Sequence, residues 1–565
     1  MKRLSSLMLI ALGFAVFAVS CKSGGDSNVH VPKDAAVVVH INNSSLSTKL
    51  TWQEIQATDW FKDLYNREND SLIRKMLDNP DNSGIDTKAD MIFYIRKLGR
   101  GSYLAFEGTL KDAKAFEAFN AKMDPNASAA KSGDGSVMKL KDGALVYWEG
   151  TKLVYVADMP IPDYSSISSG GNYEPYKLPQ DSLQSYAKYS LTVKGDESLG
   201  SDPRFNSLLA EGGDLHLWMN NDQYLSALGA ANVLGMMKAA DLIKGNVSAI
   251  TASFDNGKIN IDSKAYMNQQ LTDLFQKYRP KKISADIINR IPSKDVVAVM
   301  AMNYPPEGLK ELIKLAGLDG VANDFLTKAN YSINDFIKAN KGDVVVAISD
   351  FSVTTKEVTY PSYDGGEPFK TTQTAPDAKF LFATSINDKA AFDKLITTLS
   401  KEAGDIPKQA APTVTYQLNN DWFVAGNSAD YNSKFMAGGN SNLPFAGKLA
   451  DKSFGMFVDF QKLMKGSQSS MKDTIDREAL DASIKVWEDL VAYSGDFKDG
   501  GFTSHFEINL VDKSVNSLKQ LNQYANTLFA IDKKRSARYK VADMAPDSQV
   551  IIDSATVVAP PAPAN

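Results

Sequence analysis

The chain has few of the residues on which metal and redox sites depend. Its 565 residues include one cysteine, Cys21, and four histidines. A single cysteine excludes an intrachain disulfide and every CxxC motif. The histidines His30, His40, His216 and His505 never lie three or four residues apart, so no HExxH helix exists and we expect no transition-metal site. His216 and His505 lie in β-rich runs, where we expect each to pair within a sheet.

Common catalytic motifs are also missing. The chain has no GxSxG motif, no phosphate-binding P-loop and no GxGxxG segment that opens a helix. The segment 426–430, Gly-Asn-Ser-Ala-Asp, lacks the final glycine of a nucleophile elbow, and we predict a loop there. We therefore predict a protein that is not an enzyme, with no catalytic residue and no cofactor. A hydrolase built from scattered carboxylates is the remaining catalytic alternative.

Long apolar runs are absent after the first twenty residues. Residues 7–19 form an apolar run of 13 residues, whereas a membrane-spanning helix needs about 20. The run follows Lys2 and Arg3 and leads into Ala18-Val19-Ser20-Cys21, a pattern typical of a bacterial lipoprotein signal. We predict that residues 1–20 are removed, that Cys21 is lipidated, and that residues 21–29 form a flexible tether. An ordinary secretory signal and an uncleaved N-terminal anchor are the alternatives.

The predicted anchor and the charge define the expected compartment and partners. Lys22, at the second mature position, argues against retention in the inner membrane. We therefore predict an anchor in the outer membrane and a body in the periplasm, with surface exposure left open. The chain carries 62 basic and 67 acidic residues, a net charge of −5, which gives no electrostatic reason to bind nucleic acid.

Much of the sequence occurs twice. Residues 31–42 and 291–303 both place a proline before a β-rich run that closes on asparagine. Five further pairs follow in the same order: 83–95 with 332–348, 103–117 with 380–393, 153–158 with 422–426, 215–220 with 454–459, and 254–261 with 497–508. This order predicts two similar units, 30–284 and 285–535, followed by a partly disordered tail at 536–565.

The turns indicate the fold class. Asn256-Gly257 and Asp499-Gly500 separate β-rich segments, as hairpin turns of the primed type do, and they predict antiparallel pairing. We therefore expect an α+β fold in which each unit is a largely antiparallel sheet with helices on one face. Predicted helices include 268–278, 390–401, 479–490 and 514–529.

Two loops rich in glycine and aromatic residues, 160–180 and 358–376, are the candidate ligand-contact sites. Exposed aromatic rings on such loops stack on sugars or contact a protein partner. The alternative is a pair of variable surface insertions whose rings fold back on the body. The candidate residues are Tyr164, Tyr173, Tyr176, Tyr360, Tyr363 and Phe369.

The stretch 78–90 is dense in oxygen donors. Laid on the EF-hand template it begins with Asn79 and ends with Asp90, where a bidentate glutamate is needed. The same residue types form turns for reasons of their own backbone. We therefore predict turns here and no metal site.

The chain resembles the Bacteroidetes lipoproteins grouped as the domain of unknown function DUF4836. The resemblance rests on Cys21, on Val31-Pro32-Lys33-Asp34-Ala35 with the strand at 37–42, on residues 46–49, and on residues 83–86 before a strand. It implies a compartment and an architecture, but no mechanism. We expect a non-enzymatic cell-envelope lipoprotein, a binding or assembly scaffold whose partners are the membrane, through its anchor, and an envelope protein or glycan. The alternative is a glycan-binding lipoprotein of polysaccharide uptake that uses the two aromatic loops.

Overall fold

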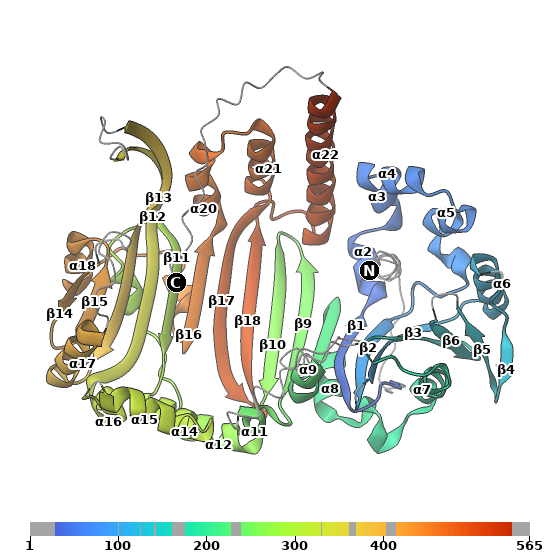
Figure 1. Cartoon of the computed structure of the whole chain (residues 1–565), viewed down its shortest axis with the longest axis horizontal. Helices are drawn as coiled ribbons and strands as arrows, with labels where there is room; N and C mark the ends of the chain where they lie inside the picture. Colours follow the sequence, from blue (N-terminus) through green and yellow to red (C-terminus); the bar gives the residue numbers. More distant parts are fainter. Residues whose placement is uncertain are drawn as a thin grey trace, which may run out of the picture.

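The protein has a mixed α+β fold built on an antiparallel sheet. The computed structural model describes residues 29–99, 101–124, 126–140, 143–160, 176–227, 239–328, 330–360, 369–402 and 414–544. All strands of the described residues belong to one sheet of 18 strands. Helices gather at both ends of these strands (Figure 1). Within the described ranges, no helix combines the length and the hydropathy needed to cross a membrane.

The strands of the first half lie in the spatial order β4-β5-β6-β7-β3-β2-β1-β8-β9-β10, and each pairs antiparallel with its neighbours. Their bounds are β1 (Ala35–Ile41), β2 (Met91–Leu98), β3 (Gly101–Thr109), β4 (Ala130–Ser132), β5 (Gly135–Lys139), β6 (Leu145–Glu149), β7 (Lys152–Asp158), β8 (Leu215–Asn220), β9 (Val247–Asp255) and β10 (Lys258–Tyr266).

The second half continues the same sheet in the order β18-β17-β16-β11-β12-β13-β15-β14. The bounds are β11 (Val296–Asn303), β12 (Asn340–Tyr360), β13 (Phe369–Ile386), β14 (Thr415–Leu418), β15 (Trp422–Gly426), β16 (Phe454–Asp459), β17 (Trp487–Lys498) and β18 (Gly501–Leu510). β10 pairs antiparallel with β18, from Lys258 opposite Asn509 to Tyr266 opposite Gly501. The two halves therefore share one sheet.

Many helices begin at a side chain that caps their first free N–H groups. Asp112 and Asp473, for example, accept backbone hydrogen bonds at the starts of α6 and α21. The helices are α2 (Asn43–Lys49), α3 (Trp52–Gln56), α4 (Asp59–Arg67), α5 (Ser71–Asp78), α6 (Ala113–Met123), α7 (Gln180–Thr192), α8 (Pro203–Ala210), α9 (Asn221–Ala227), α11 (Ala239–Ile243), α12 (Gln269–Lys277), α13 (Ala285–Asn289), α14 (Pro306–Leu315), α15 (Asp319–Lys328), α16 (Ile333–Ala339), α17 (Lys389–Glu402), α18 (Ala429–Met436), α19 (Ala446–Leu449), α20 (Phe460–Ser467), α21 (Thr474–Ile484) and α22 (Ser517–Met544).

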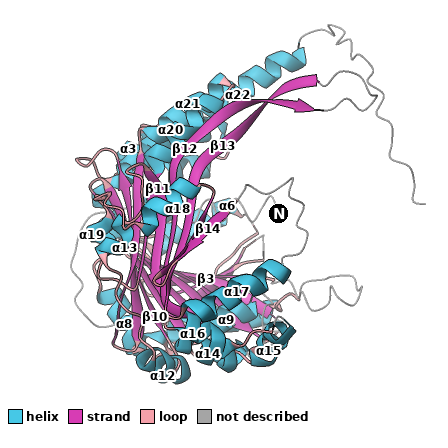
Figure 2. Ribbon diagram, turned by 90° about the vertical axis from the view of Figure 1, so that its left-hand side faces the viewer, coloured by secondary structure: helices cyan, strands magenta, loops and turns pink. Residues whose placement is uncertain are grey.

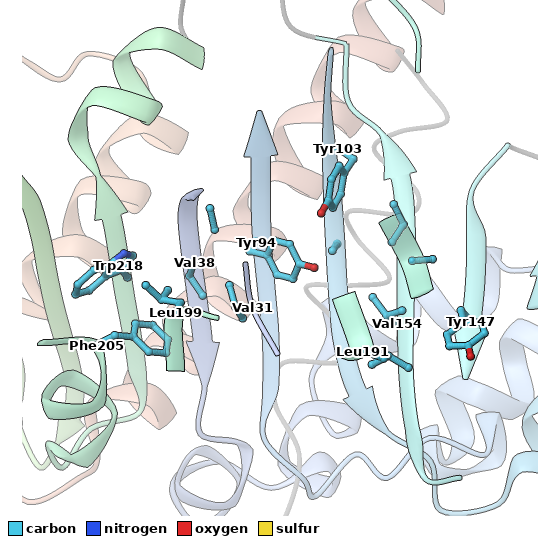
Figure 3. Close-up of a cluster of buried hydrophobic side chains, with 14 of the residues drawn as sticks. Val31, Val38, Tyr94, Tyr103, Tyr147, Val154, Leu191, Leu199, Phe205 and Trp218 are labelled. Atoms are coloured by element: carbon cyan, nitrogen blue, oxygen red, sulfur yellow. The ribbon is translucent and has the colours of Figure 1, made fainter. Parts of the chain in front are cut away.

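Helices cover both faces of the sheet, so the expectation of helices on one face is wrong. Val154 of β7 joins a core with Leu191 of α7 and Phe205 of α8 (Figure 3). Its neighbour Leu153 joins a second core with Phe116 of α6. The strand sequences explain the difference. Residues 145–148 of β6 are apolar and buried at four successive positions. Because successive side chains point to opposite faces, both faces of the sheet must be covered by packed side chains at this strand.

The second half is covered in the same way. α18 and α19 pack on one face, over a core that contains Val299 and Phe457. α17 packs on the other face, where Phe392 contacts a core with Phe423. Both outer parts of the sheet are therefore enclosed by helices.

The two predicted hairpins are confirmed as antiparallel pairs, β9 with β10 and β17 with β18. Asp499 and Gly500 have φ of 49° and 76°, as a type I′ turn requires. In the first hairpin only Gly257 has a positive φ, 67°, so the primed turn predicted there is wrong.

Two predicted elements are corrected by the structure. The helix expected at 479–490 ends with α21 at Ile484, and β17 begins at Trp487, because pairing with β16 and β18 overrides the helical spacing. The loop expected at 358–376 belongs largely to β12 and β13, which pair from Ser352 opposite Asp377 to Tyr360 opposite Phe369. Valine and threonine, which favour strands, dominate this ribbon. Figure 2 shows that it extends beyond the rest of the sheet. In addition, α22 continues to Met544, past the predicted boundary at residue 535.

Gly342 provides a test of the packing at the start of β12. It lies in a register shift of β12 and has a φ of 100°, and a Cβ atom there would lie 1.8 Å from the carbonyl oxygen of Tyr304. We predict that Gly342→Ala lowers the free energy of unfolding by about 2–4 kcal/mol, measured by denaturant unfolding. The control Gly212→Ala, where no atom lies within 4 Å, should change it by less than about 0.5 kcal/mol. Equal effects of the two substitutions would contradict this account.

Candidate binding surface

Half of the six predicted ligand-contact residues, and the predicted lipidation site, lie outside the part of the chain that the structure describes. Cys21, Tyr164, Tyr173 and Tyr363 lie outside the described residues. The backbones of Tyr360 and Phe369 are directly opposite each other at the end of the β12–β13 ribbon. Tyr176 is 43% exposed and lies beside Gly101, at the start of β3 in the other half of the sheet. The structure thus pairs the backbones of Tyr360 and Phe369 and places Tyr176 far from them, in the segment before α7 and beside the start of β3.

The oxygen-rich stretch 78–90 forms turns and ion pairs. The side chain of Asn79 caps a 3₁₀ turn at Pro80–Ser83. The carboxylate of Asp81 accepts hydrogen bonds from the hydroxyl of Thr87 and from Lys111, each at 2.6 Å. These contacts are the ordinary reason for such residues in a turn.

His40 and His216 form a buried pair across β1 and β8. Their Nδ1 atoms lie 3.0 Å apart, while Nε2 of His40 lies 3.2 Å from Asp90 and Nε2 of His216 lies 3.1 Å from the carbonyl oxygen of Glu211. Each of these three contacts needs one N–H donor, and two neutral imidazole rings supply only two. The pair therefore carries one positive charge when all three hydrogen bonds are made. Burial, reinforced by the neighbouring ring of His40, lowers the pKa of His216. His505 likewise has a partner, Asp262 on β10, at 2.8 Å.

Glu107 on β3 is a buried carboxyl group that no motif predicted. Its Oε1 atom has no hydrogen-bond partner. Burial raises the pKa of Glu107 to about 8, against the attraction of Lys152, so the group is neutral at pH 7. The ammonium group of Lys152 instead donates to Nε2 of His30, at 2.6 Å. The sequence signal was a lone glutamate inside an apolar strand, which by itself does not distinguish a buried carboxyl from an exposed one.

A further candidate surface is an apolar face on the central strands, which we define by two cross-strand rows. Residues paired directly across antiparallel strands lie on the same face of the sheet. The first row is Leu215, Ala252, Ile261, Phe506, Ala492, Met456, Met300, Val346 and Phe382. The second row is Phe254, Ile259, Ile508, Leu490, Val458, Ala298, Ile348 and Phe380.

The apolar face is incompletely covered. Most of its side chains are partly exposed, and Ile348 and Phe380 are 37% and 42% exposed. Leu215 and Phe382, at the two ends of the first row, pack against helix-covered cores. Between them, Phe506, Met456 and Met300 belong to none of the buried clusters formed by the described residues.

The opposite face is polar on β10 and β18, whereas on β11, β16 and β17 it forms the buried core that contains Val299, Phe457 and Val491. Lys258 of β10 pairs with Glu507 of β18 at 2.9 Å, and Asp262 pairs with His505. An antiparallel sheet commonly exposes one face and buries the other, with alternating residues to match. On β10 and β18 this alternation favours burial of the apolar face.

Helices stand on the apolar side at both ends of the strands (Figure 2). At one end, Phe275 of α12 packs edge-on against Phe502, with ring centroids 5.0 Å apart. Phe502 precedes Phe506 by four residues on β18 and so lies on the same face. At the other end, Leu518 of α22 packs in a cluster with Phe254. The apolar face of the central strands thus lies between α12 at one end of the strands and α22 at the other.

Comparison with known proteins identifies the family. The family model described as "Domain of unknown function (DUF4836)" matches residues 27–363, more than half of the chain. The chain belongs to this family, as its sequence features suggested. No curated protein matches the chain.

Solved structures offer only a distant likeness. Crystal forms III and I of a protein called TP0453 are each 10% identical to this chain, with TM-scores of 0.25 and 0.23. Each alignment covers 46% of this chain, and 90% and 89% of the respective TP0453 chains.

The raised pKa of Glu107 predicts a specific dependence of stability on pH. Between pH 4.5 and about 8 the unfolded chain ionises this carboxyl while the folded protein keeps it protonated. The free energy of unfolding contributed by Glu107 therefore falls as pH rises, by at most about 1.4 kcal/mol per pH unit. Glu107→Gln should remove this contribution, so the variant gains stability over the wild type as pH rises from 5 to 8 in denaturant unfolding. The control is Glu117→Gln, at an exposed position on α6. A Glu107→Gln difference that does not change with pH would contradict the prediction.

Proposed function

We propose that this protein is a lipid-anchored, non-enzymatic binding protein of the bacterial cell envelope. In this proposal Cys21 carries the lipid, the anchor lies in the outer membrane, and the body lies in the periplasm. The observation that carries the binding role is the apolar face, because apolar surface left open on a folded protein marks a site of interaction. The N-terminal signal supports the location.

The arrangement of the apolar face supports a role in binding rather than in stability alone. Its two rows cross nine and eight strands from both halves of the chain, so a bound partner would contact the whole central sheet. The strands that form it are held by backbone pairing on both sides. This rigidity lowers the entropic cost of binding.

The two halves, 30–284 and 285–535, are in this proposal copies of one unit. Seven strands of the first half each correspond to one strand of the second half, and corresponding strands have corresponding neighbours. The order β1, β2, β3, β7, β8, β9, β10 matches the order β11, β12, β13, β15, β16, β17, β18. All six repeated sequence pairs fall on corresponding strands. The last strand of each half pairs antiparallel with the last strand of the other, which relates the halves by an approximate two-fold rotation.

A glycan-binding lipoprotein of polysaccharide uptake is the second candidate. The observation that favours it is the position of Tyr360 and Phe369 opposite each other at the end of the projecting ribbon. Binding on a glycan array that is lost in Tyr360→Ala and Phe369→Ala would support this candidate. Binding that survives both substitutions would oppose it.

The anchor is tested by detergent phase partitioning of the full-length protein. We predict that the wild type enters the detergent phase and that mass spectrometry finds acyl chains on Cys21, because two or three chains bind a bilayer firmly. The Cys21→Ser variant should lack the acyl mass and leave the detergent phase. A wild type that stays in the aqueous phase without acyl mass would refute the anchored location.

A further inference from the structure

We propose that the apolar face binds the acyl chain of a lipid. This inference rests on the proposed function in taking the face as a binding surface, and it adds the chemical class of the ligand. The two rows, from Leu215 to Phe382 and from Phe254 to Phe380, contain only aliphatic, aromatic and thioether side chains. Since these side chains offer no strong hydrogen-bonding group, the complementary ligand surface is hydrocarbon.

The dimensions of the rows suit an acyl chain. Eight neighbouring strands at a spacing of about 4.8 Å give a row about 34 Å long. A lipid acyl chain spans half of a bilayer core that is about 30 Å thick. Each row is therefore long enough for one extended chain.

The helices at the two ends of the strands argue against a second sheet as the occupant. Packed sheets lie about 10 Å apart, and a helix with its side chains is about 10–12 Å across. α12 and α22, which contact the apolar face through Phe275 and Leu518, occupy that depth at the two ends of the strands. A flat sheet from a second copy would meet these helices, whereas a single acyl chain is thin enough to lie between them.

The centre of the face is adaptable. Met300 and Met456 are cross-strand partners on β11 and β16, and both are partly exposed. Methionine is unbranched and polarisable, so it fits hydrocarbon ligands of varied shape. Ala252 in the same row is partly exposed and leaves room beside the larger side chain of Ile261.

The predicted anchor would hold the folded body near a membrane. Seven residues lie between Cys21 and Val29, the first described residue, and the eight steps from one to the other span at most about 29 Å. The body would therefore stay within about one membrane thickness of the bilayer surface.

The test is a titration of the full mature chain, residues 21–565 with Cys21→Ser, with a fluorescent fatty acid, using palmitate as competitor. We expect saturable binding that palmitate displaces. The double variant Met300→Gln with Met456→Gln should bind roughly tenfold more weakly, because it places two amides against hydrocarbon at nearly unchanged volume. Met123→Gln is the matched control: Met123 is 38% exposed at the end of α6, outside both rows, and its substitution should leave binding unchanged.

A second measurement keeps the test independent of folding. Palmitic acid that carries a photoreactive diazirine should label wild-type peptides from β10, β11, β16 and β18. The thermal midpoint of the double variant should equal that of the wild type, since both side chains lie on an open face. Absence of fatty acid binding, labelling confined to other elements, or unchanged affinity in the double variant would each overturn the inference. A lowered midpoint would show that the face is already covered by protein, and would overturn it as well.

This experiment is independent of the anchor. Acyl binding without lipidation of Cys21 would contradict the anchored location and support the inference. Lipidation of Cys21 without acyl binding by the apolar face would support the anchored location and contradict the inference.

Discussion

The pairing of β10 with β18 is the interaction on which the rest of the architecture depends. It joins the two halves through nine residue pairs, from Lys258–Asn509 to Tyr266–Gly501. Its register determines both faces at once, because a slip of one residue would move every side chain of a strand to the other side. In the observed register, the ion pair of Lys258 with Glu507 and the contact of Asp262 with His505 share one face, and the apolar rows continue on the other. Without this pairing both rows would stop at an open sheet edge.

The two faces of this junction contribute differently to stability. Ion pairs at partly exposed positions contribute at most about 1 kcal/mol each, so the polar face adds little beyond setting the register. The apolar side chains contact their lateral neighbours but lack a covering layer, unlike Val154 or Phe457 in the enclosed cores. The central strands are therefore less stabilised by side-chain burial than the outer parts of the sheet. An apolar ligand that binds only the folded sheet would raise the stability of this region through linkage.

Sequence patterns predicted the local elements and missed what depends on neighbours distant in the chain. The hairpin at Asp499-Gly500 and the strand at 296–303 could be predicted because turn residues and β-branched runs act locally. The alternation Lys258-Ile259-Asn260-Ile261-Asp262 was visible as well, but the residues beside it in the sheet were not. Asp262 contacts His505, 243 positions away, and no spacing rule gives that register. For the same reason the sequence favoured a helix at 487–490, where contacts with β16 and β18 decide the structure, and left Glu107 unnoticed.

The position of the junction explains why an apolar surface stays open in a protein that otherwise buries its sheet. In the first half α6 covers this side of the outer strands, and in the second half α17 does the same. The helices that follow β10 and β18, α12 and α22, lie at the ends of the strands and leave the central face clear (Figure 1). Each half thus leaves its inner strands uncovered on the same side. Joining the halves edge to edge unites these two narrow apolar strips into one continuous apolar face.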